Sequence, residues 1–437
     1  MWARKGTRDN SLARRARIDD YFGCLSLYAS SLVYTQLLAA CVGSYMLVVA
    51  SPTAIRQALV VEVERGMKIA VVAWRYWSAA HRYRALMENA LKAGHEVCCI
   101  ASNHLQDSDM TMQLLGKLGI TGIRGTEKVI SQKLNEFNAD AVFGEYRWNL
   151  LEETIAHAWA TQTNKPSFIL DHSQYYAQAV QAPVPQWARS TLLTVNGMAS
   201  QQAKKKGWKK AIAVGQPEFD LIQDYDIPTI RQRLRCKEGQ PLVALFLEHV
   251  SGTGSPRGRD FKQEKRNMTI FVKLAAKRGW RVCVHCHGQE RTAQGHIYHQ
   301  GRVSFLNQLQ SLGATFVTGF LPGTADGVVF EQCHPYELIA AADAVTGSHL
   351  DTVMTCYTLG KKYFVFYNID TYGARQDGQY RAYRSEIPAF STVGKDFSLL
   401  IGAVEEDKGK CEHDDAVTKK WFYALDGNCW RRMLSLI

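Results

Sequence analysis

Short apolar segments alternate with amphipathic helical segments along most of the chain after Met67. Lys68–Ala73 predicts a buried strand, 79–93 predicts a helix, and Glu96–Ala101 predicts the next strand. Strands that are separated by helices at this spacing usually pair in parallel, because each helix carries the chain back over the sheet. The alternation therefore predicts an α/β fold with helices on both faces of each sheet.

The alternation is interrupted between Gln223 and Gln240, where two aspartates, a proline and a short basic helix occur, and it resumes at Pro241. A chain of 437 residues is long enough for two domains and an extension. We predict an N-terminal α/β domain over residues 67–226, a C-terminal α/β domain over residues 240–395, and amphipathic helices over residues 396–437.

Residues 1–66 precede the first predicted strand. The stretch 21–55 has no charged residue and is long enough to span a bilayer, and three arginines lie shortly before it. However, Ser, Thr, Gln and Gly dilute its apolar character, and MKIAVVAW from Met67 is a typical start of a cytosolic α/β enzyme. We expect residues 1–66 to be a wrongly included upstream extension; a membrane anchor and a soluble segment are the alternatives.

The composition favours a reducing compartment and an anionic partner. The formal net charge of +11 suits a nucleotide, a lipid head group, a teichoic-type polymer or DNA, without choosing among them. The eleven cysteines are scattered, and Cys283 and Cys286, the one CxxC spacing, should point to opposite faces of a strand. This pattern indicates neither a zinc site nor a disulfide framework. We predict a cytoplasmic protein, with association to a membrane left open.

The stretch from His334 to Tyr380 predicts an anion site. After a helix and a short strand, the chain turns at Gly347 and starts a new helix. Backbone N–H groups and hydroxyls that gather at such a helix start bind anions, although an ordinary helix cap would look the same. We infer that the second domain holds a phosphate-bearing ligand. The candidate residues at the turn are Ser348, His349, Asp351 and Thr352.

Histidines near other strand and helix ends extend this candidate site. His287 follows a predicted strand and could donate a hydrogen bond to a phosphate oxygen. His334 and Glu337 begin a predicted helix, where they could contact a nucleotide or simply cap the helix. We predict no bound metal, because alternate residues of one strand, such as His285 and His287, lie too far apart to share an ion with Cys283.

Polar residues also follow the strand ends of the first domain, and the carboxyl ends of parallel strands meet at one edge of a sheet. His172 is favoured as the base for a hydroxyl group, because a histidine titrates near neutrality, and Asp171 and His81 are the alternatives. A strand-end histidine that bonds only to the backbone would give the same pattern. The candidates to hold an acceptor are Arg75, Arg82 and Glu145.

In order and spacing, these segments resemble the two-domain glycosyltransferases of the GT-B fold, and most of all the CDP-glycerol glycerophosphotransferase and capsule-polysaccharide transferase group. In the second domain the similar segments are VCVHCHG (282–288), HPYELIAAADAV (334–345), GSHLDT (347–352) and GKKYFVFYNIDTYGARQDGQY (360–380). In the first domain they are KPSFILDHS (165–173) and AIAVGQPEFD (211–220). The group's paired serines after the turn are replaced here, and Thr355 stands where an acidic residue is usual.

The resemblance implies two Rossmann-like domains that face each other across a cleft. A UDP- or CDP-linked donor would lie against the second domain and a polymer or lipid-linked hydroxyl acceptor against the first. The implied reaction moves a sugar or a sugar-alcohol phosphate during synthesis of a surface polysaccharide or teichoic-type polymer, and it needs no metal. The alternatives are a nucleotide-sugar 2-epimerase or hydrolase on the same fold, a phage-type DNA glycosyltransferase, and a sugar-binding protein with a decayed site.

Overall fold

The computed structural model describes residues 66–73, 75–102, 108–145, 151–171, 189–247, 261–286, 303–319, 322–348, 352–366, 386–393 and 396–437. The expectations for residues 1–66 fall outside this range, apart from Gly66. Gly66–Ile437 forms one compact unit. Within the described residues, no helix combines the length and the apolar character that crossing a membrane requires.

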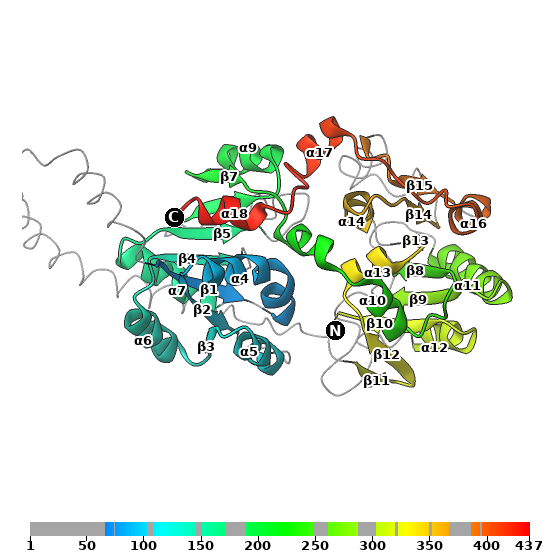
Figure 1. Cartoon of the computed structure of the whole chain (residues 1–437), viewed down its shortest axis with the longest axis horizontal. Helices are drawn as coiled ribbons and strands as arrows, with labels where there is room; N and C mark the ends of the chain where they lie inside the picture. The colour runs from blue at the N-terminus through cyan, green and yellow to red at the C-terminus, as the bar shows by residue number, and fades with distance from the viewer. Residues whose placement is uncertain are drawn as a thin grey trace, which may run out of the picture. The chain divides into compact units, whose positions relative to one another are not determined.

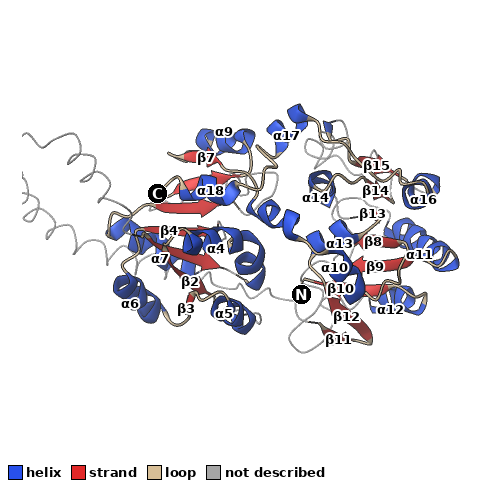
Figure 2. Ribbon diagram, in the orientation of Figure 1, coloured by secondary structure: helices blue, strands red, loops and turns tan. Residues whose placement is uncertain are grey.

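The first sheet is parallel throughout, with strand order β3-β2-β1-β4-β5-β6-β7 (Figures 1 and 2). The chain moves outward from β1 to β3 and then returns to add β4 on the other side of β1. Its strands are β1 (Lys68–Ala73), β2 (Glu96–Ala101), β3 (Thr121–Ile123), β4 (Ala141–Glu145), β5 (Ser167–Leu170), β6 (Thr191–Thr194) and β7 (Ala211–Ala213). Its helices are η1 (Ser78–Arg82), α4 (Arg84–Lys92), α5 (Ser108–Lys117), α6 (Glu127–Phe137), α7 (Leu151–Gln162) and α9 (Gly197–Lys205).

The second sheet has the order β11-β12-β10-β9-β8-β13-β14-β15, and only the β11–β12 pair is antiparallel. Its strands are β8 (Leu242–Phe246), β9 (Arg281–His285), β10 (Thr315–Thr318), β11 (Gly323–Ala325), β12 (Val328–Gln332), β13 (Ala344–Gly347), β14 (Tyr363–Val365) and β15 (Phe390–Thr392). Its helices are α11 (Phe261–Lys277), α12 (Val303–Ser311), α13 (Pro335–Ala341) and α14 (Thr352–Thr358).

The central strands of both sheets, such as β1 and β8, are buried on both faces, which explains why they are continuous apolar runs. In β1, Ile69 and Val71 lie in a core with α4, whereas Ala70 and Val72 lie in a separate core with α6 and α7. In β8, alternate residues divide in the same way between a core with α13 and α14 and a core with α11 and α12. The predicted α/β fold class, with two parallel-dominated sheets, is confirmed.

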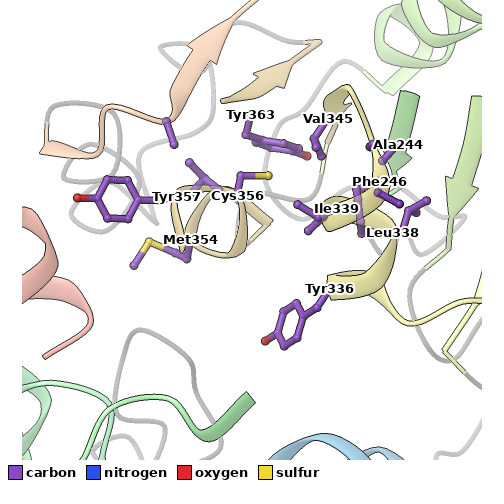
Figure 3. Close-up of a cluster of buried hydrophobic side chains, with 14 of the residues drawn as sticks. Ala244, Phe246, Tyr336, Leu338, Ile339, Val345, Met354, Cys356, Tyr357 and Tyr363 are labelled. Carbon is purple, nitrogen blue, oxygen red and sulfur yellow. The ribbon is translucent and has the colours of Figure 1, made fainter. Parts of the chain in front are cut away.

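Figure 3 shows the core on one face of the second sheet. Ala244 and Phe246 of β8 lie there with Leu338 and Ile339 of α13, and all four side chains are buried. This packing matters for the site, because it fixes the start of α13 against the carboxyl ends of the strands. Cys283 and Cys286 belong to different cores of this sheet, in agreement with the prediction that they face opposite ways.

The connection between the sheets contains η2 (Pro217–Asp224) and α10 (Ile227–Arg233), and the chain ends in α16 (Ser398–Glu405), α17 (Asp415–Trp421) and α18 (Cys429–Leu434). α16 packs on the second sheet, whereas α18 returns to the core between β1 and α4. Asp220 of η2 holds the start of α18, since its carboxylate accepts hydrogen bonds from the N–H groups of Cys429 and Trp430 at 3.0 and 2.7 Å.

This contact predicts a pH-dependent stability. Burial raises the pKa of Asp220 to about 6, against the lowering effect of the two N–H groups. An acid whose pKa is raised by folding stabilises the folded state when it is protonated, so the contribution is lost as the pH rises through about 6. Between about pH 4 and pH 7, we expect the free energy of unfolding of the wild type to fall by about 2–3 kcal/mol relative to Asp220→Asn. Urea titrations of both proteins at several pH values measure the difference between their free energies of unfolding. A difference that does not change with pH would contradict the prediction.

Candidate functional site

A buried charge network lies at the carboxyl end of β4. The Arg82 guanidinium donates from Nε to Glu218 Oε1 at 2.5 Å and from Nη1 to Glu145 Oε1 at 3.1 Å. The side chain of Arg82 is 1% exposed and those of both glutamates are 0% exposed. Glu145 ends β4 and Glu218 belongs to η2, so Arg82 joins the first sheet to the segment that leads into the second domain.

The charges in this network depend on one another. Burial opposes the charge on Arg82, but Glu218 and Glu145 outweigh it and raise the Arg82 pKa. Burial also raises the pKa of Glu218, although Arg82 counteracts this. Gln216 donates to the second oxygen of Glu218 at 2.5 Å, and Glu153 accepts from the N–H of Glu145 at 2.9 Å. Each glutamate of the network is thus held by a second contact besides the one to Arg82.

A single turn of π-helix, η1, presents Arg82 to this network. The N–H of Tyr83 donates to the carbonyl of Ser78 at 2.9 Å, which is the wide spacing of a π turn. The sequence predicted one continuous helix over 79–93, whereas the chain forms η1 followed by α4. Such turns occur often at functional sites, because they redirect one side chain out of helical register.

His81, which precedes Arg82 in η1, stacks on the ring of His334 in the second domain. The ring centroids lie 3.4 Å apart and the ring planes differ by 18°. His81 follows β1, whereas His334 follows β12 and caps α13. The stack therefore places residues from the carboxyl ends of two different sheets in direct contact.

Both imidazoles are neutral at neutral pH. Although part of the His81 side chain is exposed, desolvation of its ring and the charge of Arg84 lower its pKa to about 3. Burial, followed by the effects of His81 and His285, places the pKa of His334 well below its usual range. Neutral rings stack without charge repulsion and can donate from one nitrogen while they accept at the other.

The two ring nitrogens of His334 have different environments. Its Nδ1 accepts a hydrogen bond from the N–H of Tyr336 at 3.4 Å, which assigns the proton to Nε2. His334 is 4% exposed, and its Nε2 has no hydrogen-bond partner among the described residues. A buried N–H without a partner is energetically costly, and a bound oxygen ligand would remove that cost.

Glu337 has the capping role that the sequence left open. Its carboxylate accepts from the N–H of His334 at 2.9 Å and pairs with Arg233 at 2.7 Å. Together with the Nδ1 contact of His334, this forms a capping box at the start of α13. Glu337 therefore holds His334 in position through direct contacts.

The first residues of the predicted turn after β13, Gly347 and Ser348, are tightly packed. Gly347 has φ +147°, and Ser348 donates from its N–H to Phe246 O at 2.8 Å. Ser348 is 1% exposed and Thr352, which begins α14, is 5% exposed. Ser348 directly follows β13, whose last residue Gly347 pairs with Phe246 at the end of β8. His349 and Asp351 lie outside the described residues, as do His287 and the favoured base His172.

The other first-domain candidates lie at strand ends as predicted. Asp171 follows β5, is 6% exposed, and donates its N–H to Leu193 O at 2.8 Å. Arg75 follows β1 and is partly exposed. Of the predicted residues, direct contacts join Arg82 to Glu145 and His81 to His334. Within the described part of the chain, no group of three or more His, Cys, Asp or Glu is arranged to hold a metal ion.

Sequence reasoning missed Glu218, which holds Arg82 from the far side of the network. Glu218 lies within AIAVGQPEFD, one of the segments that resemble the transferase group, but an acidic residue after a proline is typical of any first helical turn. Its burial could not be recognised, because the partner Arg82 is far away in the sequence.

No protein-family model matches this sequence, and no curated protein matches it either. Solved structures do match. The UDP-GlcNAc 2-epimerase from Neisseria meningitidis, solved with UDP-GlcNAc, has a TM-score of 0.52 at 14% identity over 84% of this chain and 99% of its own. A candidate UDP-N-acetylglucosamine 2-epimerase from Listeria monocytogenes has a TM-score of 0.52 at 12% identity over 85% of this chain and 95% of its own. At these identities the similarity concerns the fold alone, and it shows that this chain has the GT-B fold.

Proposed function

We propose that this protein is an enzyme that acts on a nucleotide-activated sugar or sugar-alcohol phosphate and transfers it to a hydroxyl acceptor. The finer proposal, which rests on the sequence resemblance, is a transfer reaction like those of the CDP-glycerol glycerophosphotransferase and capsule-polysaccharide transferase group. The observation that carries the proposal is the His81–His334 stack, which joins the carboxyl-end edges of two sheets beside a buried Arg–Glu network. In open α/β sheets, ligands bind outside the carboxyl ends of the strands.

The proposed roles follow from these positions. The Nε2–H of His334 donates to an oxygen of the donor, and the hydroxyls of Ser348 and Thr352 contact its diphosphate. The base that accepts the proton of the acceptor hydroxyl is His172, with Asp171 as the alternative. Because Arg82 is enclosed by two carboxylates, its proposed role is to orient Glu145 toward the acceptor.

The test is ligand-induced thermal stabilisation with UDP-, CDP-, GDP- and ADP-linked donors. A ligand at 100 times its dissociation constant stabilises the folded state by about 2.7 kcal/mol, so the true donor must raise the melting temperature. We expect His334→Ala to weaken donor binding at least about tenfold, because a hydrogen bond to a buried N–H is lost. His95→Ala is the matched control, since His95 is a partly exposed histidine that accepts from the N–H of Met67 at 3.2 Å. Equal donor binding by both variants would contradict the role of His334.

A nucleotide-sugar 2-epimerase or hydrolase is the second candidate. It is favoured by the shared fold with two proteins of that description and by a network with two buried carboxylates, since acid–base chemistry on a sugar ring needs such groups. The distinguishing assay is turnover of UDP-GlcNAc without any acceptor. Release of UDP or formation of a 2-epimer would favour this candidate, whereas turnover only with an added hydroxyl acceptor would favour transfer.

A further inference from the structure

A concentrated group of lysines lies at the edge of the first sheet, at the end of α9 and before β7. Five of the seven residues from Lys204 to Lys210 are lysines, and all five side chains are exposed. The sequence from His172 to Pro217 contains no Asp or Glu. Among the described residues, these five ammonium groups take part in no ion pair. We call them the lysine patch.

The local fold holds the lysine patch together. Gly207 has φ +106° and reverses the chain, with its N–H donating to Lys204 O at 3.1 Å. Trp208, which is 2% exposed, anchors the turn, and its N–H donates to Ala203 O at 3.1 Å. The backbone of Lys210 is fixed on the sheet, where its carbonyl accepts from Leu192 at 3.0 Å. The lysines therefore project from a rigid turn.

The helix dipole explains only part of this charge. Lysines in the last turn of α9 interact favourably with its C-terminal carbonyls. Lys209 and Lys210 lie beyond that helix, on the approach to β7, so the helix dipole does not account for them. Arg189, also exposed, precedes β6, and the β6–β7 register places it at the same edge of the sheet. A sixth cation thus adds to the excess.

We propose that the lysine patch docks this protein on an anionic phospholipid surface. Clusters of four to eight basic residues bind anionic bilayers, and the binding needs no register with the lipid. β7 is the edge strand of the first sheet (Figure 1). Its Ile212, two residues after Lys210, is 38% exposed and adds an apolar contact, which suits a membrane interface. The apolar stems of the lysines would add to this contact while their ammonium groups reach the head groups.

A bilayer fits this surface better than a nucleic acid does. The cations of the patch are all lysines. A lysine acts as a point charge, whereas specific contacts to nucleic-acid phosphates favour the planar, forked guanidinium of arginine. The described residues of the patch include no exposed aromatic side chain on which a base could stack. The docking surface lies at the amino edge of β7, while Gln216 and Glu218 of the candidate site follow its carboxyl end. Docking is therefore independent of the proposed reaction.

The test is co-sedimentation of the full chain with vesicles of phosphatidylcholine alone and with about 30% phosphatidylglycerol, in low and high salt. The patch variant changes all five lysines of the patch to glutamine. The matched control carries the same loss of charge at five scattered exposed lysines: Lys92, Lys117, Lys128, Lys237 and Lys277.

We expect the wild type and the scattered variant to bind anionic vesicles and to dissociate in high salt. The patch variant should bind at least about 100-fold more weakly, since each lysine near an anionic surface contributes a factor of about five. Three results would overturn the proposal: equal loss in both variants, wild-type binding to neutral vesicles as strong as to anionic ones, or displacement from vesicles by duplex DNA at equal phosphate concentration. The measurements with neutral vesicles and with duplex DNA use only the wild type, so they test the proposal even if the patch variant misfolds. Donor-induced thermal stabilisation should be the same in all three proteins.

Discussion

Replacing Arg82 with alanine is expected to lower the free energy of unfolding by about 3–5 kcal/mol. The substitution removes the Arg82 cation from two buried carboxylates, Glu145 and Glu218, and removal of one partner from a buried ion pair is strongly destabilising. The loss should be smaller at low pH, because burial raises the pKa of Glu218 and protonation removes the charge that Arg82 no longer balances. Urea unfolding followed by circular dichroism measures both effects.

Arg84→Ala provides the matched control two residues away. Arg84 is exposed and pairs with Glu88 at 2.8 Å one helical turn further on. Exposed pairs of this kind contribute about 0.3–0.5 kcal/mol, so this variant should remain close to the wild type. If Arg82→Ala were as mild as Arg84→Ala, the buried network would not exist in solution, and the positioning role of Arg82 would be wrong.

Gly347→Ala is expected to cost about 3–5 kcal/mol and to abolish donor binding. Gly347 has φ +147°, which L-residues rarely adopt, and an added Cβ would lie 2.7 Å from the backbone N of Phe246 and closer still to its carbonyl oxygen. Backbone of a central strand cannot move aside as a flexible side chain would. The variant must therefore separate β13 from β8 and displace Ser348. Thermal unfolding and donor-induced stabilisation report the two consequences.

Gly197→Ala is the control that tests whether the loss of stability in Gly347→Ala comes from the close approach of Phe246. Gly197 begins α9 behind the cap residue Asn196, and nothing lies within 4 Å of an added Cβ. Alanine has the better helix propensity, so the change should alter stability by less than about 1 kcal/mol and in the stabilising direction. A loss at Gly197 as large as at Gly347 would show that the close approach to Phe246 is not the cause.

The sheets and their helices were predictable because local sequence carries their signal. β1 and β8 are apolar along their whole length since helices cover both faces, and that pattern is visible without any knowledge of partners. The β11–β12 hairpin escaped prediction because its strands are short and partly exposed. The break between η1 and α4 escaped it as well, since a π turn leaves no distinctive residue pattern.

The sequence by itself determined the fold class, the position of the strand ends and the polar residues that follow them, because periodicity and turn chemistry act over a few residues. Only the tertiary structure decided which of those residues meet. His81 and His334 are separated by most of the chain, and Arg82 and Glu218 are also far apart in the sequence. Their contacts nevertheless set the charge and the hydrogen-bonding capacity of the site. Such pairings depend on how two sheets are joined, and burial then lowers the pKa of each histidine in a way that no local pattern encodes.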